Sequence, residues 1–368
     1  DMRKINYYKK KIKRLGIKKT INLGYSRLVY PSYPRTINVE IMNKCNLKCK
    51  HCRVTYHGDI MKDVTPGFMD FNYFTKIIDR ISHLIKKADS FQLSTVEPLF
   101  HKDIFKMMDY VSRYNQNIRY PLLSNAMLLT EKNIKELLKR NVPAISISLD
   151  GCTKETVEAF KTNTNFDRVV SNIKLLKKLC QNKIEVCVVF VATKNNIHEL
   201  VKYVDFCKEL NIDRILVNGF LSFLPENSHL YLYSKQGNPE VQKIFQLAYE
   251  KAKRQNIDIE FPSLVPKPSG CDLHSYLNID EKGDVSPCIL LARKTPFELF
   301  SKSATIKPVI WGNIFDVGPL SIWKNKKNVQ FRKMLKNNLV PSKCTLCPDA
   351  YGLICSKRNT NIQNIQNI

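Results

Sequence analysis

Eight of the twelve cysteines stand in groups, and their spacing is the strongest chemical signal in the chain. Three of them share one short polar segment, in the order Cys45-x3-Cys49-x2-Cys52. Three thiolates on a tight loop can bind three irons of a [4Fe–4S] cluster, because thiolate is the ligand that such clusters use. The fourth iron would have no protein ligand, and a catalytic metal centre needs such an open position. The spacing therefore predicts a reactive iron–sulfur cluster.

Two other interpretations of this segment compete with a cluster. A structural zinc site normally has four ligands, and His51 is the available fourth. However, His51 adjoins Cys52, and adjacent ligands rarely close a tetrahedron without strain. Three buried core cysteines fit poorly, because lysine and asparagine side chains crowd the segment. The ungrouped cysteines stand singly among apolar neighbours and are expected to be small core residues: Cys152, Cys180, Cys187 and Cys207.

A second group of cysteines lies towards the C-terminus. Residues 271–288 read CDLHSYLNIDEKGDVSPC, and Cys344-x2-Cys347 and Cys355 follow later. Paired C-x2-C spacing occurs in zinc ribbons as well as in iron–sulfur sites, so both metals are candidates. Residues 276–279, a glycine-containing turn and Val285 predict a hairpin between the first two cysteines. A region this small has little core, so we expect a metal to hold it together.

The composition limits the class of protein. With 368 residues, 43% of them hydrophobic, the chain is long enough for one large domain and a smaller one. No run of about 18 apolar residues is present, so a membrane-spanning helix is not expected. Residues 1–20 are basic and polar, so they are not a secretory signal. We therefore expect a cytoplasmic protein whose cysteines are thiols rather than disulfides.

The net charge of +26 is concentrated towards the two ends of the chain. A basic surface of this kind attracts phosphates, so RNA is a candidate partner, and its affinity would then fall steeply with salt. Aromatic residues do not interleave with the lysines as in a base-stacking surface. A solvated basic surface without a nucleic-acid partner is the simpler interpretation.

From Arg35 onward, short β-branched runs alternate with stretches of helical periodicity. The predicted strands are 36–41, 90–94, 118–123, 144–149, 184–191 and 214–217. The predicted helices are 72–86, 104–114, 131–140, 167–179, 197–210 and 238–255. Such alternation implies a parallel sheet covered by helices. Six units are too few for a closed eight-stranded barrel, so we predict an α/β fold, a partial (β/α)6 TIM-like barrel.

Four segments follow from this pattern: a basic N-terminal extension (1–34), the barrel (35–260), a small α+β cysteine-rich domain (261–358) and a low-complexity, disordered tail (359–368). Polar turns follow all six predicted strands. Because the carboxyl ends of parallel strands form one face, we expect these turns to converge on an active site. The first cysteine segment is the turn after the first strand.

The first cysteine segment, placed after the first strand of such a barrel, resembles the radical S-adenosylmethionine (SAM) superfamily. The resemblance covers roughly residues 35–260. It implies that the open iron binds SAM and that an electron from the cluster cleaves SAM to methionine and a 5′-deoxyadenosyl radical. This radical then abstracts a hydrogen from the substrate. The resemblance also implies a cellular reductant such as flavodoxin or ferredoxin.

Two further turns resemble SAM-binding segments of the family. A Gly-Gly-Glu-Pro motif usually follows the second strand and binds the SAM amino group. Here the sequence is Thr95-Val96-Glu97-Pro98, which keeps the carboxylate but has neither glycine. Ser124-Asn125 resembles the turn after the third strand, with Ala126 in place of glycine.

Later positions complete the implied SAM site. Ser148 and Asp150 belong to a Ser-x-Ser-x-Asp-Gly segment, which resembles the family segment that contacts ribose and carboxylate. Lys161 stands nearest to the position of an arginine that often meets the SAM carboxylate, although lysine lacks the guanidinium fork. The implied cofactor-binding residues are Glu97, Ser124, Asn125, Ser148, Asp150 and Lys161.

The C-terminal cysteine group resembles the twitch and SPASM auxiliary-cluster domains of radical SAM enzymes. The full SPASM pattern has seven cysteines and two clusters, whereas five cysteines imply one auxiliary [4Fe–4S] cluster. Its implied ligands are Cys271, Cys288, Cys344 and Cys347. Cys355 is then a spare thiol, which could replace a ligand, lie buried, or donate a hydrogen atom to a substrate radical.

The resemblance implies an enzyme that oxidises, crosslinks or epimerises its substrate after hydrogen abstraction. The implied substrates are a peptide or a sugar-like metabolite. Two alternatives remain open, a radical SAM enzyme that modifies RNA and a non-catalytic metal-binding scaffold that has lost SAM binding. The missing glycines favour the scaffold, whereas the three intact cysteines and Glu97 oppose it.

Overall fold

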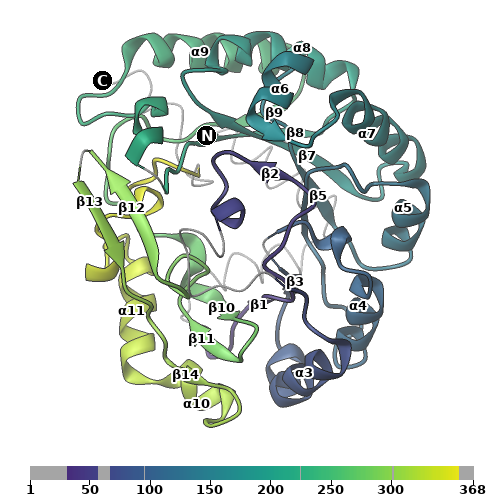
Figure 1. Ribbon diagram of the computed structural model, residues 1–368, viewed down its shortest axis with the longest axis vertical. Coiled ribbons are helices and arrows are strands. Elements are labelled where there is room, and N and C mark those ends of the chain that lie inside the picture. The colour runs from purple at the N-terminus through teal and green to yellow at the C-terminus, as the bar shows by residue number, and fades with distance from the viewer. Residues whose placement is uncertain (1–30, 57–66, 95, 224, 301, 356–368) are drawn as a thin grey trace.

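The computed structural model describes residues 31–56, 67–94, 96–223, 225–300 and 302–355 (Figure 1). The predicted disordered tail and most of the predicted basic extension lie outside these residues. Within the described ranges, none of the helices combines the length and apolar character that a membrane span requires.

All six predicted strands form, and they are parallel to their neighbours as the alternation predicts. They are β1 (Thr36–Val39), β3 (Ser90–Leu93), β4 (Leu122–Ser124), β5 (Ala144–Ser148), β7 (Glu185–Ala192) and β8 (Arg214–Gly219). β1 pairs with β3, while β4, β5, β7 and β8 pair in that order. A parallel bridge between Ser90 and Arg119 joins the two sets. β4 begins later than predicted, after Pro121, because proline has no amide hydrogen for a strand ladder.

Helices cover the outside of this partial barrel (Figure 1). They are α3 (Phe71–Ile85), α4 (Ile104–Ser112), α5 (Glu131–Leu138), α7 (Phe166–Cys180), α8 (Leu200–Glu209) and α9 (Pro239–Arg254). In α3, Phe74, Ile77 and Ile81 are buried at helical spacing. The helix begins where the Asp70 carboxylate accepts a hydrogen bond from the backbone N–H of Asn72. The predicted partial-barrel fold is therefore confirmed.

Two elements add to the predicted pattern. Helix α6 (Lys154–Phe160) buries only Val157, so its sequence has no apolar stripe by which to predict it. Strand β9 (Asp258–Glu260) pairs in parallel with β8, but it is too short to show alternation.

The segment after the barrel extends the barrel sheet. Strand β10 (Tyr276–Ile279) pairs in parallel with β1, so that Thr36 lies opposite Tyr276 and Val39 opposite Ile279. β11 (Asp284–Ser286) turns back along β10 as predicted, and β14 (Gly312–Asn313) pairs with β11. The sheet order is β14-β11-β10-β1-β3. The proposed boundary near residue 261 thus separates segments that share a sheet.

The remaining C-terminal elements lie beside β10 and β11 (Figure 1). They are the antiparallel hairpin of β12 (Thr295–Leu299) and β13 (Lys302–Ile306), followed by α10 (Pro319–Lys324) and α11 (Lys326–Lys336). The buried Arg332 guanidinium lies 3.3 Å from the centroid of the Trp323 ring and donates a 2.6 Å hydrogen bond to the Trp323 carbonyl. This contact fixes α11 against α10.

Candidate metal centres and active site

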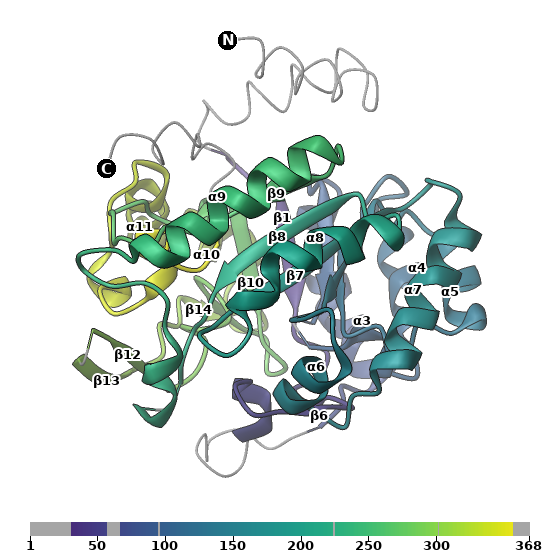
Figure 2. The same cartoon turned by 90° about the horizontal axis from the view of Figure 1, so that it is seen from above.

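The segment after β1 carries the first three cysteines on a short loop (residues 43–52), here called the cysteine loop. Within it, β2 (Lys48–Cys49) pairs antiparallel with β6 (Lys161–Thr162), which places Cys49 opposite Lys161. The backbone N–H of Cys52 donates to the Cys49 carbonyl over 3.1 Å, and the N–H of Leu47 lies 3.4 Å from the Cys45 sulfur. The loop lies on the side of the barrel that carries β6 and α6 (Figure 2).

The three thiols of the cysteine loop affect one another electrostatically. Burial raises the pKa of Cys49 to about 12, the Lys161 ammonium opposes this shift, and the Cys52 and Cys45 thiols add to it. Burial is also the main cause that raises the pKa of Cys45. Metal binding would therefore have to displace the thiol protons, which is how thiolate sites couple metal affinity to pH.

The donor set of the loop fits iron–sulfur coordination, because it offers three sulfurs and no other ligand is needed. In the part of the chain that the structure describes, no three Cys, His, Asp or Glu side chains converge as closely as one metal ion requires. The ligands of a cluster stand farther apart, because each binds a different iron. The ring of His51 packs 4.4 Å from that of Phe160, and burial lowers its pKa to about 4, so it is a neutral, packed side chain.

Glu97 joins three turns at the carboxyl ends of the strands. The Ser124 hydroxyl lies 3.0 and 3.1 Å from the two carboxylate oxygens of Glu97, and the backbone N–H of Asn125 donates to Oε2 over 2.7 Å. The Asn125 amide then donates to Asn46 Oδ1 over 2.9 Å and lies 3.9 Å from the Cys45 sulfur. A connected polar chain thus runs from the turns after β3 and β4 to the cysteine loop.

The environment of Glu97 also changes its ionisation. Its side chain is buried, and burial raises its pKa to about 7 although the bonds from Asn125 and Ser124 oppose this. Ala126, where the family pattern has glycine, has a left-handed backbone with φ of 62°, a conformation that glycine adopts at lower cost. Thr95, in the first position of the Thr-Val-Glu-Pro segment, lies outside the described residues.

The other predicted SAM contacts form a second buried unit. The Lys161 ammonium lies 3.1 Å from Asp150 Oδ2, and it donates to the Ser148 hydroxyl over 2.7 Å. Both charged side chains are almost fully buried, so each depends on the other. Asp150 also accepts the backbone N–H of Val191 over 2.8 Å. The structure therefore brings Ser148, Asp150 and Lys161 together next to Cys49, and these contacts use much of their bonding capacity within the protein.

Four of the C-terminal cysteines come together from three separate segments. Cys271 precedes a 3-10 turn (Asp272–Ser275), and Cys288 follows β11. Cys344 ends a second 3-10 turn (Ser342–Cys344), and Cys347 precedes a third (Pro348–Tyr351). Burial raises the pKa of Cys344 to about 12 and that of Cys288 to about 11, and the Cys288 thiol contributes to the rise at Cys344. Such mutual effects require short separations.

Asp349 is a carboxylate that the sequence patterns do not single out. The Cys271 thiol donates to Asp349 Oδ2 over 3.3 Å, and the backbone N–H of Cys355 donates to Oδ1 over 3.4 Å. Burial first, and this carboxylate second, raise the pKa of Cys347 well above its usual value. Asp349 therefore places Cys355 next to the four grouped cysteines.

Cys355 also lies at the strand-end face of the barrel. The preceding Ile354 carbonyl accepts the backbone N–H of Gly219, the last residue of β8, over 2.8 Å. A Cβ atom at position 219 would lie 1.9 Å from the Leu353 carbonyl oxygen, so only glycine fits there. Cys355 is thus held near the end of β8.

Arg53 joins the two cysteine groups and was not singled out from the sequence. It directly follows Cys52, it is buried, and its guanidinium donates to the Ile289 carbonyl, next to Cys288, over 3.3 Å. No local pattern marks this arginine or Asp349, because their partners lie far away in the sequence.

Comparison with known proteins identifies two domains. Residues 39–207 match the radical SAM superfamily, and residues 271–348 match the iron–sulfur cluster-binding domain SPASM. The chain therefore contains a radical SAM domain followed by a SPASM iron–sulfur cluster-binding domain. The radical SAM domain implies a [4Fe–4S] cluster and SAM as cofactors, and the SPASM domain implies auxiliary iron–sulfur coordination, as the sequence predicted.

Curated relatives and solved structures resemble most of this radical SAM chain. The tungsten-containing aldehyde ferredoxin oxidoreductase cofactor-modifying protein of Pyrococcus furiosus is 24% identical over 84% of this chain and 86% of its own length. The AdoMet-dependent heme synthase of Methanosarcina barkeri is 25% identical over 88% and 90%. Among solved structures, anSMEcpe with bound AdoMet has a TM-score of 0.62 at 20% identity, covering 89% of this chain and 88% of that one. Streptococcus suis SuiB bound to S-adenosylmethionine has a TM-score of 0.59 at 16% identity, covering 91% and 75%.

Proposed function

We propose that the protein cleaves SAM reductively at a cluster held by Cys45, Cys49 and Cys52 and abstracts a hydrogen atom from a peptide or a sugar-like metabolite. One observation carries this proposal: the three cysteines share a loop at the strand-end face, connected through Asn125 to the buried Glu97. When bound, the cluster supplies the electron that cleaves SAM. A cellular reductant such as flavodoxin or ferredoxin would provide that electron.

The surrounding side chains would bind and orient SAM. Glu97, Ser124 and Asn125 present a carboxylate, a hydroxyl and an amide beside the cysteine loop. We assign the SAM ammonium to the carboxylate end of this chain, because an ammonium would compensate a buried Glu97 anion. Ser148, Asp150 and Lys161 would complete the site from the side of Cys49, and their mutual contacts would hold β6 and therefore Cys49 in place.

The C-terminal cysteines would bind one auxiliary [4Fe–4S] cluster. We assign Cys271, Cys288, Cys344 and Cys347 as its ligands, since Cys271 donates to Asp349 beside them and their thiols raise one another's pKa, which requires short separations. Cys355 then remains available, either to replace a ligand or to donate a hydrogen atom to a substrate radical at the strand-end face.

The names of similar proteins support a wide choice of substrates. SuiB has been solved with its precursor peptide SuiA, which supports a peptide here, although that likeness of 15% identity concerns the fold. The two curated relatives are named for modifying a cofactor and for synthesising heme. Cofactor precursors therefore belong in the same substrate screen as peptides and sugars.

Anaerobic reconstitution tests the proposal. The protein should take up about eight irons per chain, as expected for two four-iron clusters, and should form 5′-deoxyadenosine from SAM once a strong reductant is added. A protein that bound zinc at the cysteine loop, or that held iron and never fragmented SAM, would contradict the proposal.

A further inference from the structure

Three neighbouring side chains, two from β1 and the residue after it and one from the segment before β12, carry buried polar atoms without hydrogen-bond partners among the described residues. They are Asn38 Oδ1, Glu40 Oε1 and Arg293 Nε, and no described residue hydrogen-bonds to any of them. The three residues are 0%, 3% and 5% exposed. An unpaired polar atom buried in this way destabilises a protein unless something binds to it.

The fold holds these side chains in fixed positions. Asn38 and Glu40 are two residues apart along an extended strand, so they point to the same face, opposite to the apolar Ile37 and Val39. The Asn38 amide donates to Asn278 Oδ1 over 2.7 Å. The backbone N–H of Glu40 continues the ladder with β10 by donating to the Ile279 carbonyl over 2.9 Å. Their free oxygens are therefore presented by a rigid sheet.

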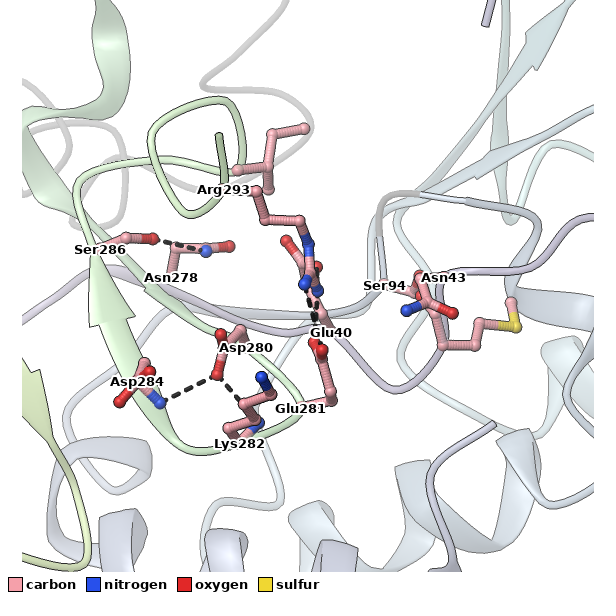
Figure 3. Close-up of polar contacts among 12 residues, drawn as sticks. Glu40, Asn43, Ser94, Asn278, Asp280, Glu281, Lys282, Asp284, Ser286 and Arg293 are labelled. Carbon is pink, nitrogen blue, oxygen red and sulfur yellow. Dashed lines mark hydrogen bonds and ion pairs between the residues drawn. The ribbon is translucent and has the colours of Figure 1, made fainter. Parts of the chain in front are cut away.

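Arg293 completes the group from the segment before β12 (Figure 3). Its guanidinium lies 3.1 Å from Glu40 Oε2 and also pairs with both carboxylate oxygens of Glu281. Two carboxylates therefore share one guanidinium, and these three side chains carry a net charge of −1. Because both oxygens of Glu281 are occupied, the unused acceptor is Glu40 Oε1. The buried unpaired oxygen favours a ligand that brings a hydrogen-bond donor, and the second carboxylate, whose side chain is 30% exposed, adds a net negative charge that favours a cationic donor.

We propose that Asn38, Glu40 and Arg293 form a substrate subsite for a protonated amine with a neighbouring hydrogen-bond donor and acceptor. The ammonium donates to Glu40 Oε1, the neighbouring donor pairs with Asn38 Oδ1, and the acceptor receives the Arg293 Nε–H. A peptide N-terminus and an amino sugar share this chemistry. The inference rests on the proposed function, because Glu40 directly follows β1, in the segment that leads into the cysteine loop, and would hold the amine near the reacting centre.

A binding experiment on the reconstituted protein tests the subsite without requiring turnover. Glycinamide carries an ammonium, an amide N–H and a carbonyl, whereas N-acetylglycinamide lacks the charge. Titration calorimetry should show saturable binding of glycinamide and none of the acetylated probe. Glucosamine serves as the amino-sugar probe. Tighter binding of glycinamide would indicate a peptide N-terminus as the natural ligand, and tighter binding of glucosamine would indicate an amino sugar.

Two matched variants test whether Glu40 binds the amine or only forms an ion pair with Arg293. Glu40→Gln should weaken glycinamide binding about tenfold or more, the usual effect of losing a charge-assisted hydrogen bond. Glu281→Gln removes the other carboxylate on Arg293 and its negative charge but no direct contact with the ligand, so it should weaken binding clearly less than Glu40→Gln does. If Glu40→Gln does not fold, Glu40→Asp shortens the side chain by one methylene group and should weaken binding to a similar extent.

Several results would overturn the inference. They are absence of glycinamide binding to the unaltered protein, equal losses in Glu40→Gln and Glu281→Gln, and unchanged binding in Glu40→Asp. A parallel loss of SAM affinity in Glu40→Gln would also overturn it, because the site would then belong to SAM. Failure to form 5′-deoxyadenosine would contradict the proposed function instead, and the binding result would stand by itself.

Discussion

The two cysteine groups offer the same kind of sulfur ligands, but the fold positions them in different ways. Cys45, Cys49 and Cys52 share one loop that follows β1 and is tied to β6. The C-terminal cysteines come from segments spread over residues 271–355, and the last described part, residues 337–355, contains only 3-10 turns and irregular chain. The first group is thus positioned by the sheet, whereas the second depends on tertiary contacts. A metal should therefore contribute more to the folding of the second group than to that of the first.

The charges beside the two groups also differ in sign. The Lys161 ammonium lies opposite Cys49 and lowers the thiol pKa against the effect of burial. The Asp349 carboxylate accepts a hydrogen bond from Cys271 and raises the pKa of Cys347 in addition to burial. Burial therefore disfavours the thiolate at both groups until a metal compensates its charge, but the nearby ammonium opposes this at Cys49 whereas the carboxylate adds to it at Cys347.

The largest expected effect is on activity, and it should differ between the two cysteine groups. Cys45→Ala should abolish 5′-deoxyadenosine formation, because it removes a ligand of the SAM-binding cluster. Cys347→Ala should retain SAM cleavage but lose product formation. Both are measured by quantifying 5′-deoxyadenosine and product in the same anaerobic assay, and normal turnover of Cys347→Ala would show that the auxiliary cluster is not catalytic.

Removal of iron should loosen the second group more than the first. After chelation, amides of residues 342–355 should lose most of their protection in hydrogen-exchange mass spectrometry, because short turns leave them few other contacts. Amides of β1 and β3 should stay protected, since they belong to the barrel sheet. Equal loss of protection in both regions would contradict the comparison.

Removal of the cation beside the first group should cost stability. Lys161→Met leaves Asp150 buried without its partner, which typically destabilises a protein by about 3–5 kcal/mol. Lys154→Met is the matched control, because its pair with Asp167 is exposed and is worth less than about 1 kcal/mol. Urea unfolding of both variants measures the difference, and equal midpoints would show that the buried pair has no special role.

The raised pKa of Glu97 should make the stability of the protein depend on pH. Burial raises its pKa to about 7 in the folded protein from 4.5, so the folded state holds the proton more tightly. Stability from this group is therefore present below about pH 4.5 and is lost as the pH rises through 7, by roughly 3 kcal/mol. Glu97→Gln should not show this loss when its unfolding free energies at pH 5 and 7.5 are compared. If the unaltered protein and Glu97→Gln changed equally with pH, Glu97 would not have a raised pKa.

Strong local patterns were enough to predict much of the fold. The long apolar run ending at Ala192 became β7, and the capped, periodic sequence after Asp70 became α3. The cysteine spacings predicted both cysteine groups. By contrast, α6 and β9 are short and carry little periodicity, so their formation depends on neighbouring elements.

Contacts between distant segments could not be predicted from the sequence. The pairing of β10 with β1 and the contacts of Asp349 join residues far apart in the chain, and no local spacing encodes them. The same is true of the ion pair between Glu40 and Arg293. The predicted SAM contacts form two separate buried groups, because Lys161 pairs with Asp150 within the protein and not with the group around Glu97.

The parallel pairing of β1 with β10 has a consequence for biosynthesis. Asn38 and Asn278 are hydrogen-bonded across 240 positions of chain. At typical synthesis rates of about 5–20 residues per second, one edge of the first strand stays open for roughly 10–50 s before its partner has been made. During that interval the nascent chain exposes unpaired backbone groups. We expect chaperones to matter most for this protein while it is still on the ribosome.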